Sequence, residues 1–169
     1  MIILETERLL LRYMLPDDIP TLVALWTDKD VTRFLGGPRE PEALKKNLAE
    51  TAANPLAEPY DLRPLVEKSS GLVIGHCGVL GKEIDGLTEY ELIYVLAKKF
   101  WGKGYATEIG RALSSYAYYV RNINRLVAQV NPENVASEHV AIKVGMHLEK
   151  EVVQPGGEKR RVYAMFLPN

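Results

Sequence analysis

One segment decides the fold of this chain: Phe100-Trp101-Gly102-Lys103-Gly104-Tyr105-Ala106-Thr107-Glu108-Ile109-Gly110-Arg111. It follows a β-rich run and opens a helical one. Glycine at 102 and 104 removes side chains that would keep a ligand away from the backbone, and the first amides of a helix have no partner inside it. We therefore expect a phosphate or pyrophosphate to bind at this junction. A helix that simply begins after a tight turn has the same local pattern.

The length, the net charge and the apolar stretches of the chain exclude several classes of protein. The chain has 169 residues, which we take as one domain spanning residues 1–169. Its formal net charge is −1, with 21 basic and 22 acidic side chains, so nucleic acid is not expected as a partner. No apolar stretch reaches the ~20 residues of a membrane span. The amino terminus carries Glu5 and Glu7 rather than a signal peptide, so we expect a cytoplasmic protein with no membrane partner.

The single cysteine, Cys77, cannot form an internal disulfide and lies within the apolar run Leu72–Leu80. We expect a small buried residue rather than a nucleophile. His76 and His139 are candidates for proton handling, but nothing in their sequence neighbourhoods separates them from structural residues. No metal site is expected.

The rest of the chain alternates strand and helix patterns without a linker. Gly145 is expected to end the last helix as a left-handed cap, and Asp85-Gly86 is expected to form a hairpin turn. This is an α+β layout, with one central sheet covered by about four helices. The expected strands are 9–13, 63–67, 72–80, 88–96, 126–130, 147–153 and 161–167, and the expected helices are 19–26, 42–53, 106–120 and 132–144.

Three motifs follow one another along the chain. They are Leu-Glu-Thr-Glu-Arg-Leu-Leu-Leu-Arg at 4–12, Tyr-Val-Leu through Trp-Gly-Lys-Gly-Tyr-Ala-Thr-Glu at 94–108, and Asn-Pro-Glu-Asn-Val-Ala-Ser at 131–137 followed by Lys-Val-Gly-Met at 143–146. In this order they resemble the GNAT superfamily of acetyl-CoA-dependent N-acetyltransferases, most closely its RimJ/RimL-like branch. The resemblance covers nearly the whole chain. It implies a mixed, mostly antiparallel sheet with two splayed parallel strands, and acetyl-CoA as co-substrate.

The resemblance implies that the diphosphate of coenzyme A lies on the amides of the loop that enters the central helix. That loop is Trp101, Gly102, Lys103, Gly104, Tyr105 and Ala106, with Thr107 able to add a hydroxyl. The family pattern is Arg or Gln, two residues, Gly, one residue, then Gly or Ala. Trp101 stands where Arg or Gln is usual, so one side-chain contact is expected to be missing. Lys103 either adds charge for the phosphates or is an ordinary exposed lysine.

The pantetheine arm of the coenzyme is implied to bind free backbone at the end of one splayed strand, Tyr94-Val95-Leu96. The second strand ends at Asn131. Asn134 occupies the position from which an asparagine side chain typically meets the pantetheine amide in this family. A plain helix cap is the competing account of Asn134.

Acetyl transfer to an amine needs a neutral amine, a polarised carbonyl and a proton for the departing thiolate. The resemblance assigns the backbone amide of Val95 to the carbonyl and Ser137 to the general acid, with a solvent-facing helical serine as the alternative. Glu89 and Glu91 project from the same face of the strand that ends at Val95. The resemblance favours Glu91 as the base, and a merely solvated carboxylate is the alternative.

The implied reaction moves the acetyl group directly to the amine, without a covalent enzyme intermediate. Acceptors in this branch include amino-terminal amines of proteins, notably ribosomal proteins, and small amines such as amino acids, polyamines and aminoglycosides. A near-neutral chain does not choose among them. The alternative function is a non-catalytic acyl-CoA-binding module that has kept the coenzyme site and lost turnover. Whether the chain forms a homodimer is open.

Overall fold

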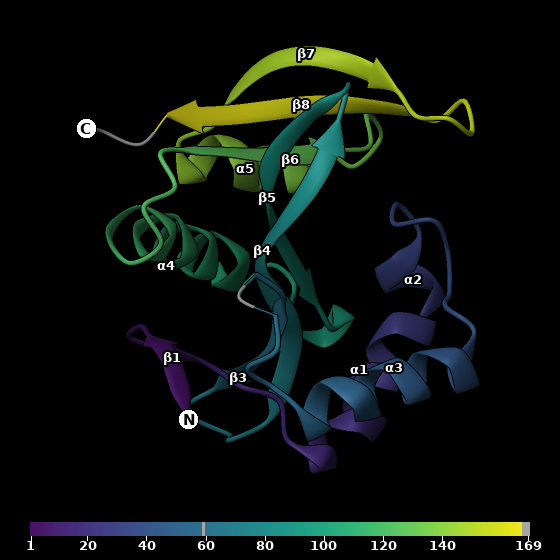
Figure 1. Ribbon diagram of the computed structural model, residues 1–169, viewed down its shortest axis with the longest axis vertical. Coiled ribbons are helices and arrows are strands. Elements are labelled where there is room, and N and C mark those ends of the chain that lie inside the picture. The colour runs from purple at the N-terminus through teal and green to yellow at the C-terminus, as the bar shows by residue number, and fades with distance from the viewer. Residues whose placement is uncertain (59, 167–169) are drawn as a thin grey trace. The chain divides into compact units, whose positions relative to one another are not determined.

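Figure 1 shows a computed structural model of the chain, which describes residues 1–58 and 60–166. The elements in chain order are β1 (Ile2–Glu5), β2 (Leu9–Arg12), η1 (Pro16–Asp18), α1 (Ile19–Thr27), α2 (Lys29–Thr32), α3 (Pro41–Ala53), β3 (Leu62–Glu67), β4 (Val73–Ile84), β5 (Leu87–Leu96), η2 (Lys98–Phe100), α4 (Tyr105–Tyr119), β6 (Arg125–Val130), α5 (Val135–Val144), β7 (His147–Val153) and β8 (Lys159–Phe166).

The strands form one sheet of eight, in the order β1-β2-β3-β4-β5-β6-β8-β7. The pairs β1-β2, β2-β3, β3-β4, β6-β8 and β7-β8 are antiparallel. β5 and β6 run parallel and pair at Glu91 and Val127. The α+β class and the mixed, mostly antiparallel sheet are therefore confirmed. Within the described residues five α-helices flank the sheet, against about four expected.

Local backbone signals set several of these boundaries. Asp85 and Gly86 both have left-handed φ angles, 52° and 76°, as the two-residue hairpin turn between β4 and β5 requires. Gly145 has a φ of 113° and ends α5, and its amide bonds the carbonyls of Ala141 and Ile142. Both turn predictions are confirmed, because glycine or aspartate at such positions is a strong local signal.

Two short elements lie outside the sequence prediction. β1 is a four-residue strand paired with β2, and α2 is a four-residue helix capped by Asp28, whose Oδ1 accepts the amides of Asp30 and Val31. Neither is long enough to show a helical or strand period. α5 begins at Val135 rather than 132, because Asn131 Oδ1 accepts the Glu133 amide at 2.9 Å and holds a turn there. The expected end of the last strand, residue 167, lies outside the described residues.

The chain divides into two compact units, and the boundaries fall within β4, β5 and α4. The first unit is Met1–Gly78 with Tyr94–Tyr105, and the second is Val79–Ile93 with Ala106–Asn169. A single domain spanning 1–169 remains a prediction. Fully buried side chains of the first unit include Leu9, Leu11, Leu22, Leu65 and Ile74, and those of the second include Ile109, Leu126, Val127, Met146 and Val162.

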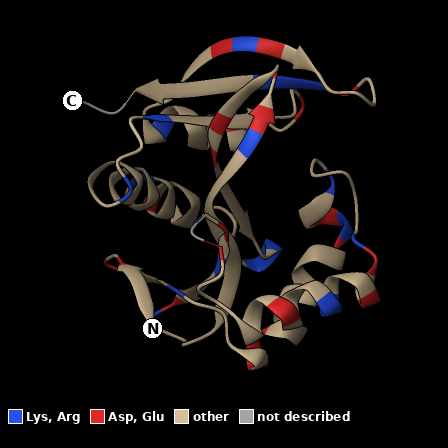
Figure 2. Ribbon diagram, in the orientation of Figure 1, with Lys and Arg blue, Asp and Glu red and all other residues tan. Residues whose placement is uncertain are grey.

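Within the second unit, α4 approaches α5 closely at Gly110. A Cβ on Gly110 would lie 2.7 Å from Cγ2 of Val144, so a larger residue there would force α4, α5 or the Val144 side chain to shift. β7 forms one edge of the sheet. Figure 2 shows acidic, basic and acidic residues in turn along it, at Glu149, Lys150 and Glu151. Charges of this kind discourage an edge strand from pairing with another chain.

No helix among the described residues is long and apolar enough to cross a membrane.

Candidate active site

The loop from Trp101 to Ala106 adopts an unusual backbone before α4 begins. Gly102 and Gly104 have φ angles of 73° and 80°, which side-chain-bearing residues rarely adopt. A Cβ on Gly102 would meet nothing within 4 Å, so the space beside the loop is open at that point. α4 starts at Tyr105, and the first amides of a helix have no partner within the helix. This donor set suits the charge and the oxygen atoms of a diphosphate.

Trp101, which replaces the usual Arg or Gln, folds back onto the end of β5. Its indole Nε1 donates a hydrogen bond to the carbonyl oxygen of Leu96 at 2.8 Å, and the residue is 47% exposed. The side chain therefore fixes the start of the loop instead of extending toward a phosphate. Lys103 is exposed, with its Nζ 5.1 Å from the ring centroid of Phe100.

Sequence reasoning missed two residues, Arg8 and Glu67, that hold this loop and the start of α4 in place. Arg8 Nη1 donates to the carbonyl oxygen of Lys103 at 2.9 Å, and its guanidinium carbon lies 4.5 Å from the ring centroid of Tyr105. The Tyr105 hydroxyl donates to Oε1 of Glu67, a residue that is 8% exposed. Arg8 lies inside the opening motif, which was a usable signal. Glu67 had none, because a strand-end glutamate is ordinarily a surface residue.

At the end of β5, one backbone hydrogen bond shows which residues direct their backbone groups toward β4. Ala97 donates its amide to the Ile74 carbonyl of β4, at 2.9 Å. The backbone of Val95 also faces β4, because alternate residues of a strand direct their backbone groups to the same edge and a Cβ on Gly75 of β4 would lie 2.5 Å from the Val95 carbonyl oxygen. This direction argues against Val95 as the donor to an acetyl carbonyl. Because neighbouring residues of a strand point their backbone groups to opposite edges, Tyr94 and Leu96 are the better candidates.

Glu91, the favoured base, is 5% exposed and lies on β5 in the second unit. Its Oε1 accepts a hydrogen bond from the Gln129 amide on β6, at 3.3 Å. Lys82 Nζ lies 2.6 Å from Oε2, which is an ion-pair distance. The pair lacks hydrogen-bond geometry, so Oε2 is buried without a hydrogen-bond partner among the residues described. The carboxylate of Glu91 is therefore held by one backbone amide and one ammonium group, and its role as the base stays a prediction.

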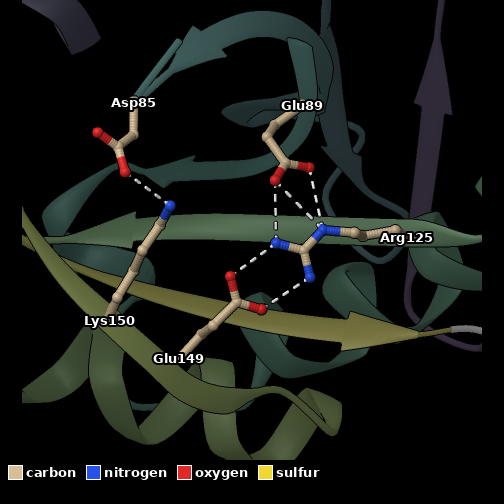
Figure 3. A network of polar contacts seen from close by, with 5 residues as sticks. All are labelled: Asp85, Glu89, Arg125, Glu149 and Lys150. Atoms are coloured by element: carbon tan, nitrogen blue, oxygen red, sulfur yellow. Dashed lines mark hydrogen bonds and ion pairs between the residues drawn. The ribbon is translucent and has the colours of Figure 1, made fainter. Parts of the chain in front are cut away.

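The carboxylate of Glu89 is bound by a different charged side chain, that of Arg125. Figure 3 shows its carboxylate held by Arg125, whose guanidinium also holds Glu149, while Lys150 pairs with Asp85 nearby. The Arg125 Nη2 to Glu89 Oε1 distance is 2.9 Å. The two carboxylates raise the pKa of Arg125, so its charge is permanent and Glu89 remains bound to it. Both glutamates are thus paired with a cation, Glu89 through hydrogen bonds from a guanidinium and Glu91 through an ion pair without hydrogen-bond geometry, and the choice of Glu91 as the base stays a prediction.

Asn134 and Ser137 are brought together at the start of α5. Asn134 is the N-cap residue, and its Oδ1 accepts the amide of Ser137 at 3.2 Å. The helix cap, which is the alternative role for Asn134, is therefore present in the structure. Contact between Asn134 and pantetheine stays a prediction. The Nδ2 group of the same side chain is the part that would donate to a ligand. Asn131, Asn134 and Ser137 are all half-buried.

The candidate residues divide between the two units. The first unit holds Tyr94, Val95 and Leu96 of β5, and Trp101, Gly102, Lys103, Gly104 and Tyr105 of the loop. The second unit holds Glu91, Ala106, Thr107, Asn131, Asn134 and Ser137.

Comparison with known proteins gives the family. The model for the "Acetyltransferase (GNAT) domain" matches residues 8–147. The chain belongs to the GNAT acetyltransferase family.

Two relatives cover most of this GNAT chain. It is 32% identical over 150 residues to the uncharacterized protein YkkB of Bacillus subtilis (strain 168), covering 88% of this chain and 87% of YkkB. It is 33% identical over 138 residues to the uncharacterized N-acetyltransferase p20 of Bacillus licheniformis, covering 79% and 76%. The class of enzyme, an acetyltransferase, is confirmed.

Solved structures confirm the GNAT fold. A GNAT-family acetyltransferase from Bacillus anthracis matches with a TM-score of 0.82 at 25% identity, covering 98% of each chain. RimL, a ribosomal L7/L12 alpha-N-protein acetyltransferase solved in complex with coenzyme A, matches with a TM-score of 0.80 at 20% identity, covering 99% of this chain and 98% of RimL. The second likeness shows the fold alone, so the RimJ/RimL-like branch stays a prediction.

Burial decides the chemistry of Cys77 and His76, the two other side chains of this GNAT chain that the sequence offered as possible reactive groups. Cys77 is fully buried, and burial raises the pKa of its thiol to about 12, so it is no nucleophile near neutral pH. Burial lowers the pKa of His76 to about 4, and Trp26 donates its indole N–H to His76 Nδ1 at 3.1 Å. His76 is therefore neutral and is tied to Trp26.

Proposed function

We propose that this chain transfers the acetyl group of acetyl-CoA directly to a primary amine. The observation that carries the proposal is the loop before α4, where two left-handed glycines lead into the start of a helix and the space beside Gly102 is open. Membership of the GNAT family supports acetyl-CoA as the donor. The donor set needs no metal, because the amides and the helix start supply the positive charge.

In this proposal the coenzyme is bound mainly through backbone groups. The amides of Gly102 to Ala106 hold the diphosphate, since the Trp101 amide already donates to the Lys98 carbonyl oxygen at 3.1 Å. The Thr107 hydroxyl adds a donor. The pantetheine arm lies along the backbone groups of Tyr94 and Leu96, with contributions from Asn131 and from Nδ2 of Asn134. Acetyl-CoA supplies an activated acyl group as a thioester, and the protein supplies orientation and proton transfer.

Glu91 accepts the proton that the acceptor amine must lose, either directly or through water. Ser137 gives a proton to the sulfur as the carbon–sulfur bond breaks and the carbon–nitrogen bond forms. Solvent then returns a proton to Ser137 and takes the one held by Glu91, so atoms and charges balance over the turnover. Amides at the end of β5, at Tyr94 or Leu96, stabilise the negative charge that develops on the carbonyl oxygen. Proton transfer by a positioned side chain contributes roughly 10²- to 10⁴-fold in rate.

The proposed class of acceptor rests on the resemblance to the RimJ/RimL-like branch, which is itself a prediction. The opening motif at 4–12 and the loop motif resemble RimJ/RimL-like enzymes, so we propose an amino-terminal amine of a protein or a small primary amine as the acceptor, in the cytoplasm. The structural neighbour RimL is a protein acetyltransferase by its own description. A homodimer is compatible with this proposal and is tested by light scattering.

An acceptor screen tests the proposed function. The purified chain is mixed with acetyl-CoA and peptides, polyamines, amino acids or aminoglycosides, and released coenzyme thiol is measured. At least one amine should give turnover that Glu91→Gln lowers by roughly 10²-fold or more, with unchanged coenzyme affinity by calorimetry. Coenzyme binding without turnover on any amine would instead identify a non-catalytic acyl-CoA-binding module. No coenzyme binding would reject both functions.

A further inference from the structure

The turn before β2 lies next to the end of β3 in the first unit. Leu9 of β2 pairs with Glu67 of β3 in the antiparallel ladder. One residue further, the amide of Lys68 donates to the carbonyl oxygen of Arg8 at 3.0 Å. The backbone positions of Arg8 and Glu67 are therefore fixed side by side by strand pairing.

From this position Arg8 reaches the glycine loop in two ways. Its Nη1 donates to the Lys103 carbonyl oxygen at 2.9 Å, and its guanidinium carbon lies 4.5 Å from the ring centroid of Tyr105. A Cβ built on Gly104 would lie 3.4 Å from Arg8 Nη2, so the guanidinium lies in van der Waals reach of the loop there. Glycine at 104 is explained by its left-handed φ of 80°.

Glu67 also binds Tyr105, the first residue of α4. Its Oε1 accepts the Tyr105 hydroxyl at 2.5 Å and its Oε2 accepts the Ser70 hydroxyl at 2.7 Å. The hydrogen bonds from Tyr105 and Ser70 lower the pKa of Glu67, so the carboxylate keeps its charge at neutral pH. Arg8 and Glu67 together fix the first residue of α4 through the face and the hydroxyl of one tyrosine ring.

We propose that Arg8 is a positioning residue for coenzyme binding. Its guanidinium clamps the Lys103 carbonyl and the Tyr105 ring, so that the amides of the loop are held in the shape that receives a diphosphate. This inference rests on the proposed function, because it concerns the same coenzyme. It adds to the backbone donors a side chain that lies 95 residues away in sequence from the carbonyl it binds.

An arginine suits this task better than a lysine. A planar guanidinium donates hydrogen bonds from its edge while its face packs on an aromatic ring, whereas an ammonium group is a compact point charge that cannot do both in the same geometry. The effect expected is a loss of preorganisation in the loop when Arg8 is replaced, because its amides must then be ordered at the moment of binding.

Calorimetric titrations of the full chain test the proposal. The variants are Arg8→Met, Arg8→Lys and, as a matched control, Lys45→Met on the exposed face of α3. The probes are coenzyme A, dephospho-coenzyme A, which lacks the 3′-phosphate, and pantetheine, which lacks all phosphates. Arg8→Met should weaken both nucleotides by about tenfold and leave pantetheine within about twofold. Arg8→Lys should weaken them by about fivefold, and Lys45→Met should match the original chain.

Each other outcome has a defined meaning. Equal nucleotide affinity in Arg8→Met and the original chain overturns the inference, as does full affinity in Arg8→Lys, which would mean that charge alone matters. A loss confined to coenzyme A means that Arg8 meets the 3′-phosphate directly, which also overturns it. A loss shared by pantetheine also overturns it, because pantetheine has no phosphate for the loop to bind. If Arg8→Met does not fold, Arg8→Lys decides the matter. If the original chain binds no coenzyme, the proposed function fails rather than this inference alone.

Discussion

Oε1 of Glu91 accepts a hydrogen bond from the backbone amide of Gln129, at a distance of 3.3 Å. The contact joins β5 to β6 two residues beyond their backbone pairing at Val127. A side-chain oxygen thus meets a backbone amide past the point where the two strands pair. This contact fixes the carboxylate of the proposed base.

Replacing Glu91 with Gln should lower kcat by roughly 10²- to 10⁴-fold, because the amide keeps the shape of the side chain but cannot take a proton. Coenzyme affinity should not change. The matched control is Glu89→Gln on the same strand face. It should keep kcat within about threefold and lower the free energy of unfolding by about 1 kcal/mol, because it weakens the Arg125 network. Equal losses of kcat in both variants would rule out a specific role for Glu91.

Asn134 can be tested for two roles at once. Asn134→Ala should lower the free energy of unfolding by about 1 kcal/mol, because the cap on the Ser137 amide is lost. Asn134→Asp should restore that stability, since a carboxylate also accepts the amide. It should not restore the KM for acetyl-CoA, which we expect to rise about tenfold, because a carboxylate cannot donate to pantetheine. A normal KM in Asn134→Asp would leave Asn134 as a cap only.

Gly75 on β4 should tolerate no side chain. A Cβ there would lie 2.5 Å from the Val95 carbonyl oxygen, which is backbone and cannot move cheaply. Gly75→Ala should therefore lower the free energy of unfolding by about 2 kcal/mol or more in urea titrations. The control is Gly81→Ala on the same strand, where a Cβ would meet nothing within 4 Å. That variant should be neutral or slightly stabilising, and a loss as large as at Gly75 would contradict the packing argument.

Acid should weaken the first unit through Asp18. Burial alone would raise the pKa of Asp18, but hydrogen bonds from Arg12, at 2.7 Å, and from the Leu15 amide lower it below the usual value. The contribution of Asp18 to stability is therefore complete above the unfolded-state pKa of about 3.9 and is lost as pH falls through the lower folded-state pKa.

Asp18→Asn should lower the free energy of unfolding at pH 7 by about 1–3 kcal/mol, because Arg12 loses a charged partner. The difference from the original chain should shrink between about pH 5 and pH 2. The exposed neighbour Asp17→Asn serves as the control and should show no such convergence. A difference that stays constant with pH would mean that the ion pair is not the cause.

Much of the fold was predictable because its signals are local. The Asp85-Gly86 turn and the Gly145 cap each require backbone conformations that few residues adopt, so sequence alone places them. The helix after Gly104 was predictable from apolar spacing. β1 and α2 were not, since four residues span about two strand periods or one helical turn.

The site was less predictable than the fold. The contact between Arg8 and Lys103 joins segments far apart in sequence, and no local pattern carries it. The direction of the Val95 amide depends on strand register, which side-chain alternation does not give. The Glu67 partner of Tyr105 follows only from tertiary packing.

Cys77 has a practical consequence for enzymology. Reagents that report free sulfhydryl groups react with the ionised form, and this chain has one cysteine, fully enclosed and with a pKa of about 12. The folded enzyme should therefore contribute almost no background colour to such an assay, even at high protein concentration. Slow turnover on a poor acceptor becomes measurable, and any colour that grows with enzyme alone reports unfolding.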